Sequence, residues 1–348
     1  MENHSVILSR RFTLACFVIF VVTISLVSAR FLGNRRPAGN TSNLSASTQM
    51  DSKSQEVTAR DEPKVHKICF LRGKWVYLAN FLTGQETQIV EGLDPALSPT
   101  GEAIIFISVK ESEGVMNRIF PPPGRLKLLD LRSREIREFK ALNEKRIGDP
   151  IWSNSGSKIA VTMSSTTREG SSIALLDPYT GALEKEIISA GIPSNEPIYL
   201  DSWTPGDRSV LFHTLAALYE LQVDGGRVEK VPVDDIFKSG AISSATHFGF
   251  SSDRRSLLFD SIIDTPKEPA TNVIFLFDIP TKTVRRVTPE GINGRAAVWL
   301  PLDKGILFSR VEWRREKWQS DICKMALDGT GLTTVVRDAD FVSYTNRY

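Results

Sequence analysis

Residues 148–161, "GDPIWSNSGSKIAV", place an aspartate, a tryptophan, three serines and a glycine turn directly before an apolar run. A carboxylate beside an aromatic ring in such a turn could act as a general acid or base, or could hold a ligand. Motifs that would support catalysis or nucleotide binding are missing: the sequence lacks the G-x-S-x-G, H-E-x-x-H, P-loop and dinucleotide-binding glycine patterns. Since catalytic triads assemble in space, a triad through His213 or His247 stays open. The histidines are His4, His66, His213 and His247.

Composition excludes several classes of function. The 43 basic and 41 acidic residues give a formal charge of +2, so no overall field favours nucleic acid. Cys16, Cys69 and Cys323 lie far apart without metal-ligand spacing, which predicts neither a zinc site nor a disulfide framework. The last two are interpreted as buried thiols on strands. No metal and no cofactor is predicted, and the 41% of hydrophobic residues suffices for a large core.

The opening stretch is one copy of an internal repeat, and a repeat changes the interpretation of each of its residues. Each copy has an aromatic residue or leucine, a polar turn and an apolar strand, followed by a second apolar strand, a turn and a more polar strand. These four strands, a to d, occupy about 40 to 55 residues, the period of a propeller blade. Five full copies begin at Leu93, Gly148, Tyr199, Thr246 and Arg295.

The two ends of the repeat region supply one more blade. Residues 67–91 look like strands b, c and d without a strand a, while residues 338–348 look like a strand a with nothing after it. Pairing between these ends closes a ring and removes the open sheet edges. We therefore predict an all-β, six-bladed propeller of four-stranded antiparallel blades over residues 67–348, acting as a monomer.

The motif "DP-x-aromatic-S-x-x-G", followed by an apolar strand and by turns such as "LDGTGLTTVV", resembles the WD40-like repeat of TolB-type six-bladed propellers. The resemblance covers residues 67–348 and implies an envelope or secreted protein. True WD40 repeats are disfavoured, because neither the Gly-His nor the Trp-Asp dipeptide occurs. The separate N-terminal α/β domain of TolB has no counterpart, since a polar segment occupies that part of the chain.

The N-terminal residues have the pattern of an export signal. Two arginines precede the apolar run 12–27, which ends in Val-Ser-Ala. Residues 1–29 are predicted to be a signal peptide or a membrane anchor, and both options stay open because the run has an intermediate length. Residues 30–66 are predicted to be a flexible polar linker. The propeller is expected outside the cytoplasm, periplasmic or secreted, and to touch the membrane only through an uncleaved N-terminal segment.

Two groups of residues are candidates for binding. The strand-a aromatic recurs in the blades and is interpreted as packing between blades. Three residues before it, a polar residue could either accept backbone N–H groups or line the mouth of the central channel. These channel-mouth residues are Asp94, Asp149, His247 and Asp338.

The second group lies in the b–c loops, which vary in length on one face, whereas the turns of the opposite face are short and regular. In loop 110–125, apolar side chains precede three prolines; in loop 310–319, aromatic and guanidinium groups combine, as at interface hot spots. Alternatively, these loops bury their own side chains. The predicted partner-binding residues are Val115, Met116, Ile119, Phe120, Trp313, Arg314, Arg315 and Trp318.

The sequence thus predicts a non-catalytic module that binds a protein or glycan in the cell envelope. The alternative is a propeller enzyme, a polysaccharide lyase or hydrolase, with its site at the channel mouth and using His247 with nearby acids.

Overall fold

The computed structural model describes residues 67–81, 83–108, 124–142, 145–164, 171–188, 196–233, 236 and 242–344. All of them belong to the unit Arg60–Tyr348. The predicted signal or anchor, the linker and four candidate residues lie outside the described residues: Val115, Met116, Ile119 and Phe120. Within the described residues, no helix has the length and apolar character needed to cross a membrane.

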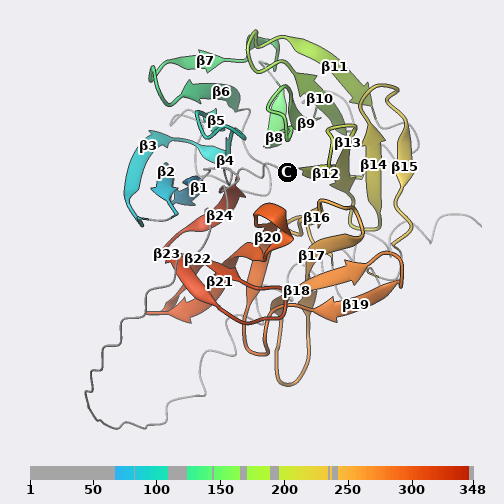
Figure 1. Cartoon of the computed structure of the whole chain (residues 1–348). Helices are drawn as coiled ribbons and strands as arrows, with labels where there is room; N and C mark the ends of the chain where they lie inside the picture. Colours follow the sequence, from blue (N-terminus) through green and yellow to red (C-terminus); the bar gives the residue numbers. More distant parts are fainter. Residues whose placement is uncertain are drawn as a thin grey trace, which may run out of the picture. The chain divides into compact units, whose positions relative to one another are not determined.

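The described strands form six separate four-stranded antiparallel sheets, which follow one another around a ring (Figure 1). The first blade contains β24 (Asp340–Tyr344), β1 (Lys67–Arg72), β2 (Trp75–Asn80) and β3 (Glu86–Glu91). The second contains β4 (Leu93–Leu97), β5 (Ala103–Ser108), β6 (Arg125–Asp130) and β7 (Ile136–Glu138). The third contains β8 (Arg146–Trp152), β9 (Ile159–Ser164), β10 (Ser171–Leu176) and β11 (Leu183–Ile188).

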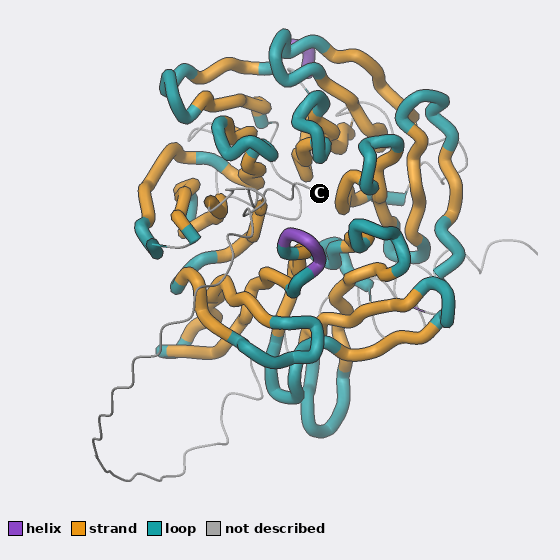
Figure 2. The backbone as a smooth tube through the Cα atoms, in the orientation of Figure 1, coloured by secondary structure: helices purple, strands orange, loops and turns teal. Residues whose placement is uncertain are grey.

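The fourth blade contains β12 (Tyr199–Trp203), β13 (Ser209–His213), β14 (Leu218–Gln222) and β15 (Val228–Lys230). The fifth contains β16 (Phe248–Phe250), β17 (Ser256–Ile263), β18 (Thr271–Asp278) and β19 (Thr283–Arg286). The sixth contains β20 (Gly294–Trp299), β21 (Ile306–Arg314), β22 (Lys317–Met325) and β23 (Thr333–Val336). The described helical elements are the short 3-10 turns η3 (Lys140–Leu142) and η5 (Pro301–Asp303), purple in Figure 2.

The ring closes as the sequence predicted. Strand β24, from the C-terminal end of the repeat region, pairs antiparallel with β1, and their register places Ile68 opposite Tyr344 and Cys69 opposite Ser343. Closure completes the first blade, so the two ends of the repeat stabilise each other. The prediction of six four-stranded blades is confirmed.

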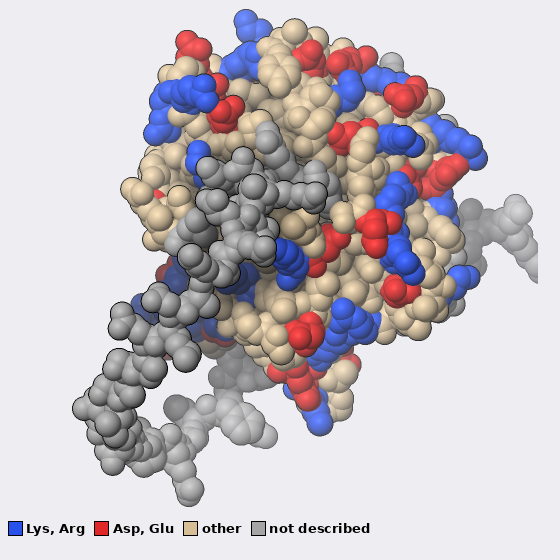
Figure 3. Space-filling model, in the orientation of Figure 1, with Lys and Arg blue, Asp and Glu red and all other residues tan. Residues whose placement is uncertain are grey.

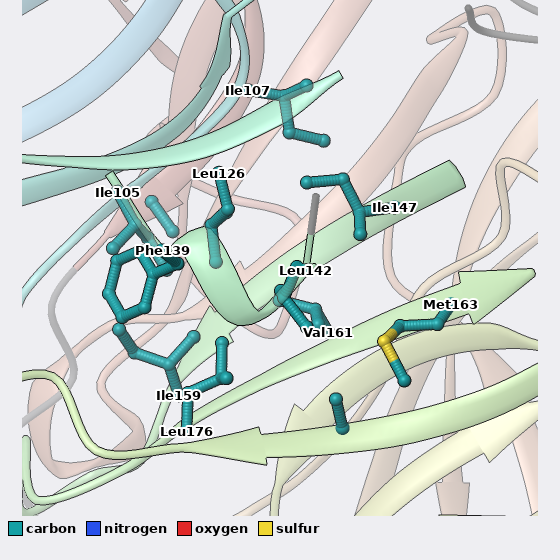
Figure 4. Close-up of a cluster of buried hydrophobic side chains, with 12 residues drawn as sticks. Ile105, Ile107, Leu126, Phe139, Leu142, Ile147, Ile159, Val161, Met163 and Leu176 are labelled. Carbon is teal, nitrogen blue, oxygen red and sulfur yellow. The ribbon is translucent and has the colours of Figure 1, made fainter. Parts of the chain in front are cut away.

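The core lies between neighbouring blades, because each sheet is covered on both faces. Strands b and c are therefore almost continuously apolar, as in "AIIFIS" and "IAVTMS". Figure 4 shows one such layer, in which Ile105 and Leu126 of the second blade pack with Ile159, Val161 and Leu176 of the third. Burial on both faces holds each blade in a fixed position relative to its neighbour.

The two cysteines on strands are buried free thiols, as predicted. Cys69 lies in β1 and Cys323 in β22, and neither is in a disulfide. Burial raises the pKa of both thiols, most strongly for Cys69. They are packing residues rather than reactive groups.

Candidate functional site

Two predicted channel-mouth residues, Asp94 and Asp149, lie within an irregularity at the start of a strand a. The register of β4 with β5 shifts between Leu93 and Ala96, and that of β8 with β9 between Gly148 and Ile151. Within these shifts, Asp94 and Asp149 have φ values of 45° and 49°. Aspartate tolerates this left-handed conformation better than most residues, which gives a local reason for its recurrence. His247 is not among the residues with positive φ.

Buried carboxylates connect each of several blades to the next one. Asp149 accepts a hydrogen bond from the N–H group of Leu200, and Asp201 Oδ1 accepts one from Phe248 N at 3.1 Å. These bonds run from the third blade to the fourth and from the fourth to the fifth. The carboxylates therefore hold the start of the following strand a, instead of capping a turn in their own blade.

The same contact continues around the ring from residues that the sequence analysis did not select. Asp260 Oδ1 accepts from Ala296 N at 3.2 Å, and also from His247 N at 3.2 Å. Asp321 Oδ1 accepts from Asp338 N at 3.1 Å. Asp260 could have been found in the sequence as an acid inside an otherwise apolar strand, "SLLFDSII". A buried charge needs a specific partner, so such an acid indicates a structural contact.

The strand-a tryptophans join neighbouring blades. Trp152 Nε1 donates to the carbonyl oxygen of Ala96 at 3.0 Å, and Trp299 Nε1 donates to that of Gly249 at 2.9 Å. The acceptor in each case precedes the aromatic position of the previous blade. This repeated contact confirms the packing interpretation for these blades.

A cavity of about 250 Å³ occupies the central channel. Its walls come from strand a of the second to sixth blades and from the a–b turns that follow two of them. Three of the four predicted channel-mouth residues line it, whereas Asp338 lies at the junction of the sixth and first blades. The polar lining includes Asp94, Asp149, Asp201 and His247, and the large aromatic lining residues are Trp152, Trp203, Phe248, Phe250 and Trp299.

Two buried carboxyls have pKa values well above their usual range. Burial, together with the nearby carboxylates of Asp94 and Asp201, raises the pKa of Asp149 to about 7. Burial likewise raises the pKa of Asp260 to about 7. Burial lowers the pKa of His247, which favours a neutral imidazole. Across the described part of the chain, no three His, Cys, Asp or Glu side chains are grouped so that they could hold a metal ion.

His213 forms a sealed ion pair with Asp201. Its Nδ1 lies 3.0 and 3.1 Å from the two oxygens of the Asp201 carboxylate, and its Nε2 lies 3.1 Å from the carbonyl oxygen of Ser243. Both side chains are 0% exposed. Burial opposes the charge of the imidazole, but Asp201 outweighs it and raises the pKa of His213. Since both nitrogens donate to oxygen, the ring is an imidazolium and has no nitrogen left to activate a nucleophile.

The other described candidates lie on the hairpin formed by β21 and β22. Trp313 and Trp318 are 52% and 53% exposed, and their rings meet edge to face with centroids 5.3 Å apart. Arg315 is exposed in the turn, whereas Arg314 is half-buried, with Nη2 2.9 Å from Asp321 Oδ2. The hairpin thus brings the two tryptophans together on the surface. Arg314 instead forms an ion pair inside the protein, with Asp321.

On the face that Figure 3 shows, the charges of the described residues do not form a surface of one sign. Figure 3 shows Lys and Arg interspersed with Asp and Glu over the described part of the visible face. This distribution fits the near balance of charges in the sequence. It gives no support to nucleic-acid binding through this face.

No protein-family model matches the chain, and no match is found among curated proteins. Solved structures do match. TolB from Acinetobacter baumannii is 15% identical, with a TM-score of 0.57 over 80% of this chain and 66% of that chain. A putative TolB from Agrobacterium tumefaciens is 15% identical, with a TM-score of 0.54 over 80% of this chain and 90% of that chain. An oligogalacturonate lyase in complex with manganese is 13% identical, with a TM-score of 0.50 over 70% of each chain.

At these identities, the likeness shows the fold. It supports the predicted resemblance: the described domain has a six-bladed propeller fold similar to that of the two TolB structures. The chain spans only 66% of the Acinetobacter TolB chain, so the partners of that whole protein do not transfer directly.

Proposed function

We propose that this TolB-type propeller is a non-catalytic binding module that works outside the cytoplasm, in the cell envelope, and binds a protein partner. Two observations support the location and the partner class: the export-like sequence of residues 1–29 and the likeness of the fold to two TolB structures. The module is either secreted or anchored through its N-terminal segment.

The half-exposed tryptophan pair carries the proposal. The strand-a tryptophans Trp203 and Trp299 are 5% and 4% exposed, whereas Trp313 and Trp318 leave about half of each side chain in solvent. Half of a tryptophan corresponds to roughly 100 Å², so covering the pair would contribute about 5 kcal/mol before the cost of association. Large aromatic residues on a surface are typical of binding hot spots.

Replacing both tryptophans with alanine should weaken partner binding at least tenfold while leaving the fold intact, because their exposed halves contribute little to the core. The measurement is capture of a partner from envelope extract by the full chain, followed by calorimetry with the purified partner. Tyr179→Ala, at an exposed tyrosine in the third blade, is the matched control and should bind normally. Normal binding by Trp313→Ala/Trp318→Ala would show that the hairpin is not part of the interface.

A second candidate function is a polysaccharide lyase with its site in the channel. One observation favours it: Asp149 and His247 both line the channel cavity, and the pKa of Asp149 is raised to about 7. The Asp149 carboxyl could exchange a proton near neutral pH, and the neutral imidazole of His247 could accept one. If this function holds, the chain releases unsaturated uronates from polygalacturonate, and His247→Ala lowers the rate at least a hundredfold. Absence of turnover by the unaltered chain would eliminate this substrate.

A further inference from the structure

The hairpin that carries the tryptophan pair extends beyond its blade. Strands β21 and β22 have nine residues each, whereas strands b and c of the first four blades have five or six. Strand β20 pairs with β21 only as far as Arg310, and β23 pairs with β22 only as far as Ile322. Residues 311–320 therefore form a two-stranded ribbon with no further strand paired to it in the described fold.

The ribbon has two chemically different faces, because side chains alternate along a strand. The register places Trp313 opposite Trp318 and Val311 opposite Ser320, which makes one face aromatic and largely uncharged. The other face carries the remaining pairs: Arg310 opposite Asp321, Glu312 opposite Gln319 and Arg314 opposite Lys317.

Ion pairs on the second face stiffen the ribbon. Arg314 Nη2 lies 2.9 Å from the buried carboxylate of Asp321, and Arg310 Nη2 lies 2.9 Å from Glu312 Oε1. The same Asp321 accepts the N–H group of Asp338, which connects the base of the ribbon to the first blade. An isolated two-stranded ribbon is only marginally stable, so this network holds the tryptophans in place.

The tip of the ribbon retains positive charge after these pairs are formed. Arg315 and Lys317 are exposed, and neither is in an ion pair with another described residue. Lys317 lies directly opposite Arg314, whose charge is already balanced by Asp321 and Glu312. The exposed Glu316 lies between the two cations, so the turn keeps one net positive charge for a partner's carboxylate.

We infer that the hairpin tip binds an acidic segment of a partner protein, with an apolar side chain against Trp313 and Trp318 and carboxylates against Arg315 and Lys317. The inference rests on the proposed function and names the chemistry of its partner. Charge complementarity with the two exposed cations at the tip of the same hairpin carries it. A protein segment fits better than a glycan because it offers apolar and acidic side chains together.

The test uses the full chain and synthetic peptides in which a central Leu-Leu pair is flanked by glutamates, or by glutamines in a neutral version. Tryptophan fluorescence reports binding at low and at high salt. The glutamate peptide should bind at least tenfold more tightly than the glutamine peptide, and the difference should shrink as salt screens the charges. Equal binding of both peptides, or no saturable binding of the glutamate peptide up to about 1 mM, would overturn the inference.

Charge reversal separates this inference from the proposed function. Arg315→Glu/Lys317→Glu should weaken glutamate-peptide binding at least tenfold, while Arg134→Glu/Lys282→Glu should not. The control pair matches in exposure, and Arg134 and Lys282 share the positive φ of Arg315. If partner capture is lost in Trp313→Ala/Trp318→Ala but kept in Arg315→Glu/Lys317→Glu, the binding function stands and the acidic-segment inference fails. Tighter binding of oligogalacturonate than of the glutamate peptide would also overturn it.

Discussion

Asp201→Ala should lower the free energy of unfolding by about 3–5 kcal/mol, because it leaves the buried His213 imidazolium without its counter-charge. The variant also removes the acceptor of the Phe248 N–H group, so the fourth and fifth blades lose a direct connection. Urea unfolding followed by circular dichroism gives the change in free energy. The matched control is Asp253→Ala, an exposed turn carboxylate for which we expect a much smaller change.

The pH dependence of stability provides a second test of the ion pair between Asp201 and His213. The pKa of His213 is raised, so its contribution is fully present below the unfolded-state value of about 6.5 and is lost as pH rises through the higher folded-state pKa. Removing Asp201 should therefore lower the pKa of His213, which NMR titration of the imidazole would detect. An unchanged titration in Asp201→Ala would mean that the ion pair does not determine the charge of His213.

Asp260→Asn should raise the free energy of unfolding at pH 8 by about 2–4 kcal/mol. Burial raises the pKa of this carboxyl from 3.8 to about 7, so its protonated form is favoured in the folded protein. The stabilisation by that form is present below about pH 4 and is lost as pH rises through about 7. An asparagine stays neutral, and its side-chain oxygen can still accept from His247 N and Ala296 N.

The control for this result is the same variant at pH 4, where the wild-type carboxyl is already protonated and no gain is expected. Asp253→Asn should show no gain at pH 8, because hydrogen bonds from Arg255 N and the Ser251 hydroxyl lower the pKa of Asp253. A stability difference between wild type and Asp260→Asn that does not vary between pH 4 and pH 8 would contradict the buried-charge explanation.

Three of these groups favour stability at acid pH, whereas His247, whose pKa burial lowers, acts in the opposite direction. His213 and the Asp149 and Asp260 carboxyls all bind protons more tightly in the folded chain than when unfolded. Each one therefore makes the propeller more stable near pH 5 than near pH 8.

Several features of the fold could be predicted because they depend on local periodicity. Alternating and continuous apolar runs between turn residues predicted the strands, and their recurrence gave the number of blades. The half-blades at residues 67–91 and 338–348 predicted closure, which β1 and β24 confirm. The strand-a aromatic was interpreted as packing for the same reason, since a residue repeated in the blades meets the same environment each time.

The candidate site could be predicted only in part. The sequence predicted aromatic and guanidinium groups in a b–c loop at 310–319, whereas the structure extends β21 and β22 through most of this range. The contacts of Arg314 depend on which residue the register places near it. The apolar loop 110–125 falls mostly outside the described residues, and its role stays a prediction. Asp94, Asp149 and His247 were expected at the channel and do line its cavity, whereas Asp338 lies at a blade junction.

The propeller architecture can be predicted from the sequence, because strand periodicity, turn chemistry and repeat length are properties of neighbouring residues. The set of acids that holds the ring together can be identified only from the folded chain. Asp201, Asp260 and Asp321 come from strands a, b and c of three different blades, so no single position in the repeat identifies them. They become equivalent only when the blades close around the channel and each carboxylate meets the backbone N–H group of the next strand a.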